Sequence, residues 1–248
     1  MNSIAANIAA VQQRIAHACA AAGRNREELR LLLPTKTVPP EAIRQALATG
    51  HLLTGENKVQ ELSNKFAALE DIPHEKHFIG HLQTNKIKDV LRYGVSCIQS
   101  VDRPELGEKL QQQLARQDRH MDILVQVNTS AEQSKFGVSP AGAVALVRQL
   151  ATCAHLHIKG LMTIGRFSAE TEQVRACFRL LRETRDEISA LDIPGVSMKE
   201  LSMGMSGDLE TAIAEGATII RVGTAIFGSR IYPDSYYWNE NKTNNEQT

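Results

Sequence analysis

Residues 31–40 of the chain are LLLPTKTVPP, a short apolar run followed by a lone lysine and two prolines. A brief apolar run bounded by proline is typical of a strand that is buried on both faces. The stretch therefore predicts a strand over Leu29–Pro34. Pro39 and Pro40 indicate that the chain leaves the strand soon after Lys36. An ammonium group at the end of a buried strand needs a reason, and the rest of the sequence supplies one.

Seven further short apolar runs follow, and segments with helical character separate them. Strands that alternate with helices imply parallel β-α-β units, and eight units in a chain of 248 residues fit a closed (β/α)₈ TIM-type barrel. An open doubly wound sheet has similar spacing and stays an alternative, although no G-x-G-x-x-G follows the first strand. The seven further strands are predicted at Leu52–Thr54, His77–Ile79, Ser96–Gln99, Asp122–Val127, Ile158–Thr163, Glu200–Ser202 and Thr218–Val222.

An extra helix is predicted over residues 3–22, before the first strand. Apolar residues recur there at spacings of four, three and four, which places them on one helix face: Ile4, Ile8, Val11 and Ile15. Gly23 is a suitable C-terminal cap. Later helix starts are predicted where Asp102 precedes Glu105 and at Ser139-Pro140.

The composition is that of an ordinary globular protein. Lys+Arg and Asp+Glu both number 28, so the chain lacks the basic excess typical of broad nucleic-acid binding. No apolar run approaches the ~20 residues of a membrane span. The four cysteines are far apart without a C-x-x-C pair, which argues against zinc and suggests a reducing cytoplasm. The histidines also lack metal-site spacing, and we predict no metal.

Polar and small residues follow nearly every predicted strand, as expected at the mouth of a barrel. Two stretches suit an anion: Ser206 and Gly207 at the start of a helix, and Gly223 and Thr224 after the last strand. Glycine allows close backbone approach, and loops after strands seven and eight of barrels often bind phosphate. Ordinary turn chemistry explains either stretch alone, but their joint placement favours phosphate.

Strand periodicity places two cations near the same point. Arg221 precedes Gly223 by two residues and shares its strand face. An ion pair with a barrel carboxylate such as Glu200 is the alternative role for Arg221. Lys36 lies on one face with Leu32 and Pro34 and so tops the barrel interior, where burial and nearby cations lower an amine pKa. Such an amine forms a Schiff base with an aldehyde. A solvated loop lysine is the alternative, but an aldehyde with a phosphate arm, such as pyridoxal 5′-phosphate, explains all these features together.

The sequence also resembles the pyridoxal-phosphate homeostasis protein family, which is similar to the barrel domain of bacterial alanine racemase. The resemblance covers residues 29 to 230 in the family's order. It is carried by TKT (35–37), GENKVQE (55–61), HFIGHLQTNK (77–86), SVDR (100–103), VQVNTSAEQSKFG (125–137), GLMTI (160–164), LSMGMSGDLETAIAEGAT (201–218) and IRVGTAIFG (220–228).

The resemblance implies a (β/α)₈ fold with the cofactor held by Lys36. It implies Arg221 near the pyridine nitrogen and Asn57 beside the cofactor. It also implies a phosphate site made of Ser206, Gly207, Gly223 and Thr224. Three positions depart from the family pattern. Lys58 replaces a usual tyrosine, Lys76 a common tryptophan and Gly165 a frequent proline. At the rim of the barrel, the packing and the partner surface therefore need not follow the family.

Three functions compete: a non-catalytic carrier and regulator of pyridoxal phosphate, an amino-acid racemase, and a sugar-phosphate enzyme with a Schiff-base lysine. An arginine at the pyridine nitrogen weakens the ring as an electron sink, and no sugar-phosphate acid/base set accompanies Lys36. Alanine racemases take their second acid from a tyrosine of a further domain, which we expect this chain to lack. Tyr232, Tyr236 or Tyr237 could serve as this acid only if the C-terminal tail folds back over the barrel.

We therefore expect a carrier without substantial amino-acid turnover. Residues 1–231 are expected to form one barrel domain, and 232–248 a polar, frayed tail. The expected protein is a cytoplasmic monomer with transient protein partners that receive the cofactor, and with no nucleic-acid or membrane partner.

Overall fold

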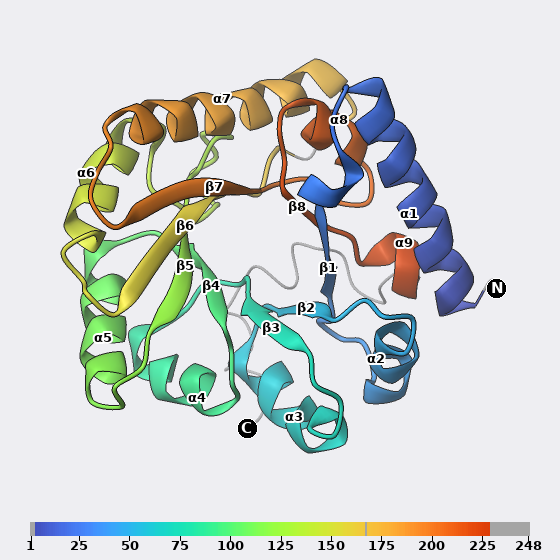
Figure 1. Ribbon diagram of the computed structural model, residues 1–248, viewed down its shortest axis with the longest axis horizontal. Coiled ribbons are helices and arrows are strands. Elements are labelled where there is room, and N and C mark those ends of the chain that lie inside the picture. The colour runs from blue at the N-terminus through green and yellow to red at the C-terminus, as the bar shows by residue number, and fades with distance from the viewer. Residues whose placement is uncertain (1–2, 167, 229–248) are drawn as a thin grey trace.

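The computed structural model describes residues 3–166 and 168–228. Its centre is a closed barrel of parallel strands that pair in chain order from β1 to β8, and β8 pairs with β1 to close it (Figure 1). The predicted (β/α)₈ barrel is therefore confirmed, and the open sheet is excluded. The strands are β1 (Arg30–Pro34), β2 (Leu53–Glu56), β3 (Glu75–Phe78), β4 (Cys97–Val101), β5 (Met121–Gln126), β6 (Leu156–Met162), β7 (Val196–Ser202) and β8 (Ile219–Arg221).

Helices surround the barrel on its outer side (Figure 1). Short 3₁₀ turns cover Arg26–Glu28 and Thr84–Lys86. The helices are α1 (Ile4–Ala21), α2 (Pro40–Leu47), α3 (Val59–Leu69), α4 (Ile87–Arg92), α5 (Pro104–Ala115), α6 (Pro140–Leu150), α7 (Thr171–Ala190), α8 (Leu209–Ala214) and α9 (Thr224–Phe227).

The extra N-terminal helix is confirmed as α1, which lies along α8 and α9 (Figure 1). Its buried face consists of Ile8, Val11, Ile15 and Cys19. Ile4, which the pattern also places inside, is only partly buried, because it is the first helical residue. Gly23 has a φ of +65°, as expected just after the end of a helix.

A helix starts at both predicted places, but only one of the two has the expected capping residue. Ser139 caps α6, because its hydroxyl accepts a hydrogen bond from the Gly142 amide at 3.2 Å. Asp102 does not cap α5. That helix starts at Pro104 after Arg103, and the Asp102 carboxylate instead accepts from the Arg103 guanidinium at 2.7 Å.

Two of the three apolar clusters among the described residues make up most of the core. One fills the barrel and takes a residue from or beside nearly every strand: Leu32, Leu53, Ile79, Cys97, Leu124, Met162 and Ile219. The other, larger cluster lies between the sheet and the helices, and it includes Leu31 and Leu33. The alternation at residues 31–33 therefore follows the two faces of the strand, and it aims every second residue of β1 into the barrel.

The predicted tail, 232–248, and its three tyrosines lie outside the described residues. Within those that are described, none of the helices has the length and apolar character of a membrane span. All four cysteines are buried free thiols. No group of three or more potential metal ligands gathers in the described part of the chain, and the absence of a metal stays a prediction.

Candidate functional site

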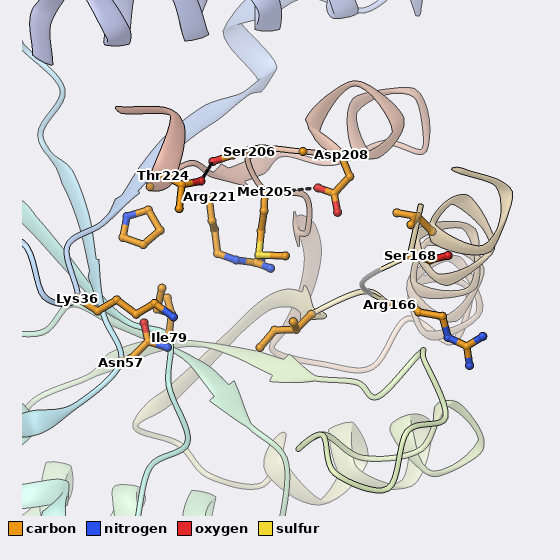
Figure 2. Close-up of a pocket in the computed structure, with 15 residues that line it drawn as sticks. Lys36, Asn57, Ile79, Arg166, Ser168, Met205, Ser206, Asp208, Arg221 and Thr224 are labelled. Carbon is orange, nitrogen blue, oxygen red and sulfur yellow. Dashed lines mark hydrogen bonds between the residues drawn. The ribbon is translucent and has the colours of Figure 1, made fainter. Parts of the chain in front are cut away.

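A cavity of about 240 Å³ lies at the carboxyl ends of the strands. All seven residues that the sequence analysis singled out line it: Lys36, Asn57, Ser206, Gly207, Arg221, Gly223 and Thr224. They come from the segments that directly follow β1 and β2, from the end of β8, and from the turns that follow β7 and β8 (Figure 2). The barrel thus brings together side chains that lie up to 188 positions apart in the sequence.

Lys36 follows β1 by two residues and is 6% exposed, so the solvated-loop alternative is wrong. In Figure 2 its side chain extends toward Asn57 and Ile79. The next residue, Thr37, has a φ of +61°, which β-branched residues rarely adopt. Backbone strain of this kind persists only where the surroundings hold it in place.

A buried ion cluster on the helix side of β1 and β2 holds the segment around Lys36. Lys65 of α3 donates to the Thr35 carbonyl at 2.6 Å and to Glu56 Oε1 at 2.8 Å. The Thr35 hydroxyl also donates to Glu56 Oε1, at 2.6 Å. Glu61 accepts from Lys65 and from the Thr37 amide. Both neighbours of Lys36 are therefore fixed, although the sequence analysis identified none of these supports.

Asn57 is held by a close approach between two loops. A Cβ atom on Gly80 would lie 2.0 Å from the Asn57 carbonyl oxygen, so only glycine fits there. Asn57 is 8% exposed, and its side-chain Oδ1 is buried without a hydrogen-bond partner among the described residues. A buried polar atom without a partner is costly, so this oxygen indicates a site for a donor from a ligand or water.

The two predicted phosphate turns lie against each other. The Thr224 hydroxyl donates to Ser206 Oγ at 2.9 Å, as the dashed line in Figure 2 shows. Ser206 Oγ also accepts from the Ala225 amide at 3.3 Å. The helix that was predicted to start at Ser206 starts instead at Leu209, because a turn over 206–208 comes first.

The N-terminal helix supports the first of these turns. Arg14 of α1 donates to the Ser206 carbonyl oxygen at 3.1 Å, and it pairs with Glu210 of α8 at 2.8 Å. The backbone N–H groups of the turn residues have no acceptor in 3–166 or 168–228: Ser206, Gly207, Gly223 and Thr224. Clustered amides without acceptors suit an anion with several oxygens.

Arg221 points into the barrel from β8 and is 5% exposed. It does not pair with Glu200, which accepts instead from the Thr218 hydroxyl. Its Nη1 donates to Ser202 Oγ and its Nη2 to the Thr163 carbonyl, both at 2.8 Å. Burial lowers the pKa of Arg221 to about 10, which still leaves it a cation at neutral pH.

Several lining residues were missed by the sequence analysis. Arg166 and Ser168 lie across the cavity from Lys36 (Figure 2). Asp208 also lines it; its Oδ1 accepts from the Met205 amide at 2.5 Å, and burial raises its pKa. Asp208 follows a glycine before a helix, which is a signal for a turn carboxylate that could have been used.

The three departures from the family pattern lie outside the cavity's lining. Lys58 directly precedes α3, and Lys76 lies in β3, where burial lowers its pKa. Gly165 lies against Phe178: an added Cβ would be 2.9 Å from that ring. His81, which follows β3, stacks on Phe136 with ring centroids 3.8 Å apart.

Comparisons with known proteins identify the family of the chain. Residues 1–231 match the family model described as "Alanine racemase, N-terminal domain". A pyridoxal phosphate homeostasis protein of Aquifex aeolicus is 44% identical over 222 residues, which are 90% of this chain and 96% of that protein. One from Pseudomonas aeruginosa is 41% identical over 232 residues, 94% of this chain and 98% of that protein.

Among solved structures, that of PipY from Synechococcus elongatus with PLP bound has a TM-score of 0.79 at 33% identity. The match covers 91% of this chain and the whole of that one. The chain therefore belongs to the alanine racemase N-terminal domain family and, within it, to the pyridoxal phosphate homeostasis proteins.

Proposed function

We propose that this protein binds pyridoxal 5′-phosphate (PLP) in the cavity, linked to Lys36 as a Schiff base. In this proposal it serves intracellular vitamin B6 homeostasis without substantial amino-acid turnover. The observation that carries the proposal is the convergence of a buried lysine, a buried arginine and two amide-rich turns on one cavity. The relative PipY, with PLP bound, is 33% identical over nearly all of this chain.

The residues present fit each part of such a molecule. The cations among the described lining residues are Lys36, Arg166 and Arg221, and Asp208 is the carboxylate, so the balance favours an anion. The amides beside Ser206 and Thr224 suit a phosphate. Two of the five N–H groups of Arg221 are used by protein acceptors, which leaves donors for a ring nitrogen.

Lys36 would supply the covalent link. Its amine nitrogen would hold the aldehyde carbon of PLP through a carbon–nitrogen double bond, with the aldehyde oxygen lost as water. PLP, when bound, supplies an aromatic ring that draws electrons from an attached amino acid. A charged Arg221 would donate to the ring nitrogen and leave that nitrogen unprotonated, which would weaken this electron withdrawal. The site thus favours holding the cofactor over reacting with amino acids.

The test is reconstitution with PLP, followed by visible absorption before and after borohydride reduction. The wild type should gain a visible band that borohydride removes, and Lys36→Ala should lack it while remaining folded by circular dichroism. Lys58→Ala is the matched control, because Lys58 lies near the same end of the barrel but does not line the cavity. A band of equal strength in Lys36→Ala would refute the assignment.

The racemase alternative is tested separately by exchange of the α-proton of L- and D-amino acids in deuterated water. Loss of one general acid typically lowers a rate by 10²- to 10⁴-fold, so trace exchange through Lys36 agrees with a carrier. Turnover above about one per second, near the low end of ordinary enzymes, would establish a catalyst instead.

Domain organisation and cellular setting belong to the same proposal. One barrel domain over residues 1–231 would act as a cytoplasmic monomer and pass the cofactor to transient protein partners. Size-exclusion chromatography with light scattering tests the monomer directly: a stable dimer would contradict it.

A further inference from the structure

A chain of buried polar side chains runs through the otherwise apolar barrel. It starts at Arg221 in the cavity, crosses the interior through Ser202 of β7 and Gln99 of β4, and continues through His77 of β3. It ends at Glu75, at the opening of the barrel opposite the cavity. We call these five residues the barrel relay. Polar groups in a core are costly unless every one is paired, so a continuous chain of them calls for an explanation.

Every link of the relay is short. Arg221 Nη1 lies 2.8 Å from Ser202 Oγ, which lies 2.6 Å from Gln99 Oε1. Gln99 Nε2 lies 2.7 Å from His77 Nδ1, and His77 Nε2 lies 2.7 Å from Glu75 Oε1. Ser202 and Gln99 are fully buried, and His77 is 2% exposed. Solvent therefore has little access to the middle of the relay.

The two ends determine the direction of every hydrogen bond. Arginine only donates, so Ser202 Oγ accepts from Arg221 and donates its proton to Gln99 Oε1. The Gln99 amide then donates to His77 Nδ1, which leaves the ring proton on Nε2 for Glu75. A hydrogen bond from His77 and the charge of Arg30 lower the pKa of Glu75 to about 2, so this end only accepts. In this arrangement every hydrogen bond of the relay joins one donor to one acceptor.

The reverse arrangement fails at one atom. If His77 Nδ1 carried a proton, Gln99 would have to turn its oxygen to the ring and its amide nitrogen to Ser202. Ser202 Oγ would then accept from both sides, and its own proton would have no acceptor among the described residues. A buried hydroxyl proton without an acceptor is costly, so this reverse arrangement is disfavoured.

We propose that Ser202, Gln99, His77 and Glu75 are positioning residues for Arg221: their one-way chain of hydrogen bonds holds the guanidinium toward the cavity and holds His77 as the neutral Nε2–H tautomer. The relay links the cation beside the cofactor to an ion pair at the far end, Arg30 with Glu75. Its role toward the cofactor rests on the proposed function, whereas its direction does not.

The direction is tested without any cofactor. Two-bond proton–nitrogen NMR spectra of ¹⁵N-labelled protein, recorded above the ordinary pKa of histidine, report the tautomer of each ring. The His77 signals are assigned by their loss in His77→Gln. We expect a bare Nδ1 and a protonated Nε2. In Gln99→Glu, whose carboxylate can only accept, both ring nitrogens should carry protons. A wild-type ring protonated on Nδ1 would overturn the direction.

The positioning role is tested by PLP titration of Gln99→Leu, with Gln126→Leu as the matched control. Gln126 is also a buried barrel glutamine, but it donates to the Phe136 carbonyl and is no part of the relay. Gln99→Leu removes the acceptor that orients Ser202 beneath Arg221, and it should weaken PLP binding up to about tenfold, the effect of losing one neutral hydrogen bond. It should also move the visible band of the bound cofactor, and Gln126→Leu should change neither.

Two further variants keep the outcome decisive. Gln99→Glu preserves the acceptor for Ser202 and should restore PLP affinity, whereas Ser202→Ala should repeat the loss even if Gln99→Leu fails to fold. Equal affinity and an unmoved band in both Gln99→Leu and Ser202→Ala would overturn the positioning role while the proposed function stands. If the wild type takes up no PLP, the proposed function fails together with the cofactor role, and the NMR result still decides the direction of the relay.

Discussion

Lys65→Met removes the ammonium group that neutralises Glu56 beneath the Lys36 segment. Lys65 is 7% exposed and Glu56 is 5% exposed, and Glu56 Oε2 already lacks a hydrogen-bond partner among the described residues. Methionine keeps the length and apolar stem of lysine, so little packing is lost. The main consequence is a buried carboxylate without its cation, which destabilises a protein by about 3–5 kcal/mol.

For a protein of this size the loss lowers the melting temperature by about 6–20 °C, at roughly 2–4 °C per kcal/mol. Arg44→Met is the matched control, because it breaks an ion pair with Asp71 whose side chains are 43% and 59% exposed. An exposed pair contributes about 0.2–1 kcal/mol. Adding Glu56→Gln to Lys65→Met removes the unpaired charge and should recover most of the lost stability.

Urea unfolding followed by circular dichroism measures all four proteins. Burial is the main cause that raises the pKa of Glu56, and Lys65 opposes it. Without Lys65 the Glu56 carboxyl takes up a proton more readily in the folded state. The loss of unfolding free energy in Lys65→Met should therefore shrink as the pH falls from neutral. A loss of unfolding free energy no larger than that of Arg44→Met would refute the view that this ion cluster is a buried support for the Lys36 segment.

Two further predictions concern the phosphate and the acid side of the stability curve. Ser206→Ala and Thr224→Ala should each weaken PLP binding about ten- to a hundredfold and leave binding of phosphate-free pyridoxal nearly unchanged in titrations; equal losses for both ligands would contradict the phosphate site. The pKa of Glu75 is lowered to about 2, mainly by the hydrogen bond from His77, so its stabilising contribution is present above the ordinary pKa of 4.5 and is lost as the pH falls toward 2. Urea midpoints of Glu75→Gln should therefore vary less with pH across that window than those of the wild type. Parallel curves of midpoint against pH would contradict this contribution of Glu75.

The fold was predictable because each strand carries a local signal. The run at 31–33 alternates between the barrel interior and the helix side of the sheet, and a barrel needs only such runs and helices between them. The ends of strands were less predictable. β7 begins at Val196, four residues before the predicted start, because its first residues are only partly buried and form no apolar run.

The cavity residues were predictable because the carboxyl ends of barrel strands meet at one place, so position along each strand was sufficient. The supports behind them were not, since they join residues far apart in sequence. Lys65 reaches the Thr35 carbonyl across 30 positions, and Ser202 reaches Gln99 across 103. Such pairs form only when the barrel closes, and local sequence patterns do not predict them.

The central claim is that Lys36 carries the cofactor, and peptide mapping of the reduced complex tests it most directly. The protein is loaded with PLP and reduced with borohydride, which converts the Schiff base into a stable secondary amine. It is then digested and analysed by mass spectrometry. The account predicts one dominant modified peptide, with the pyridoxyl group on Lys36 between Thr35 and Thr37. A pyridoxyl group found mainly on any other lysine would contradict it.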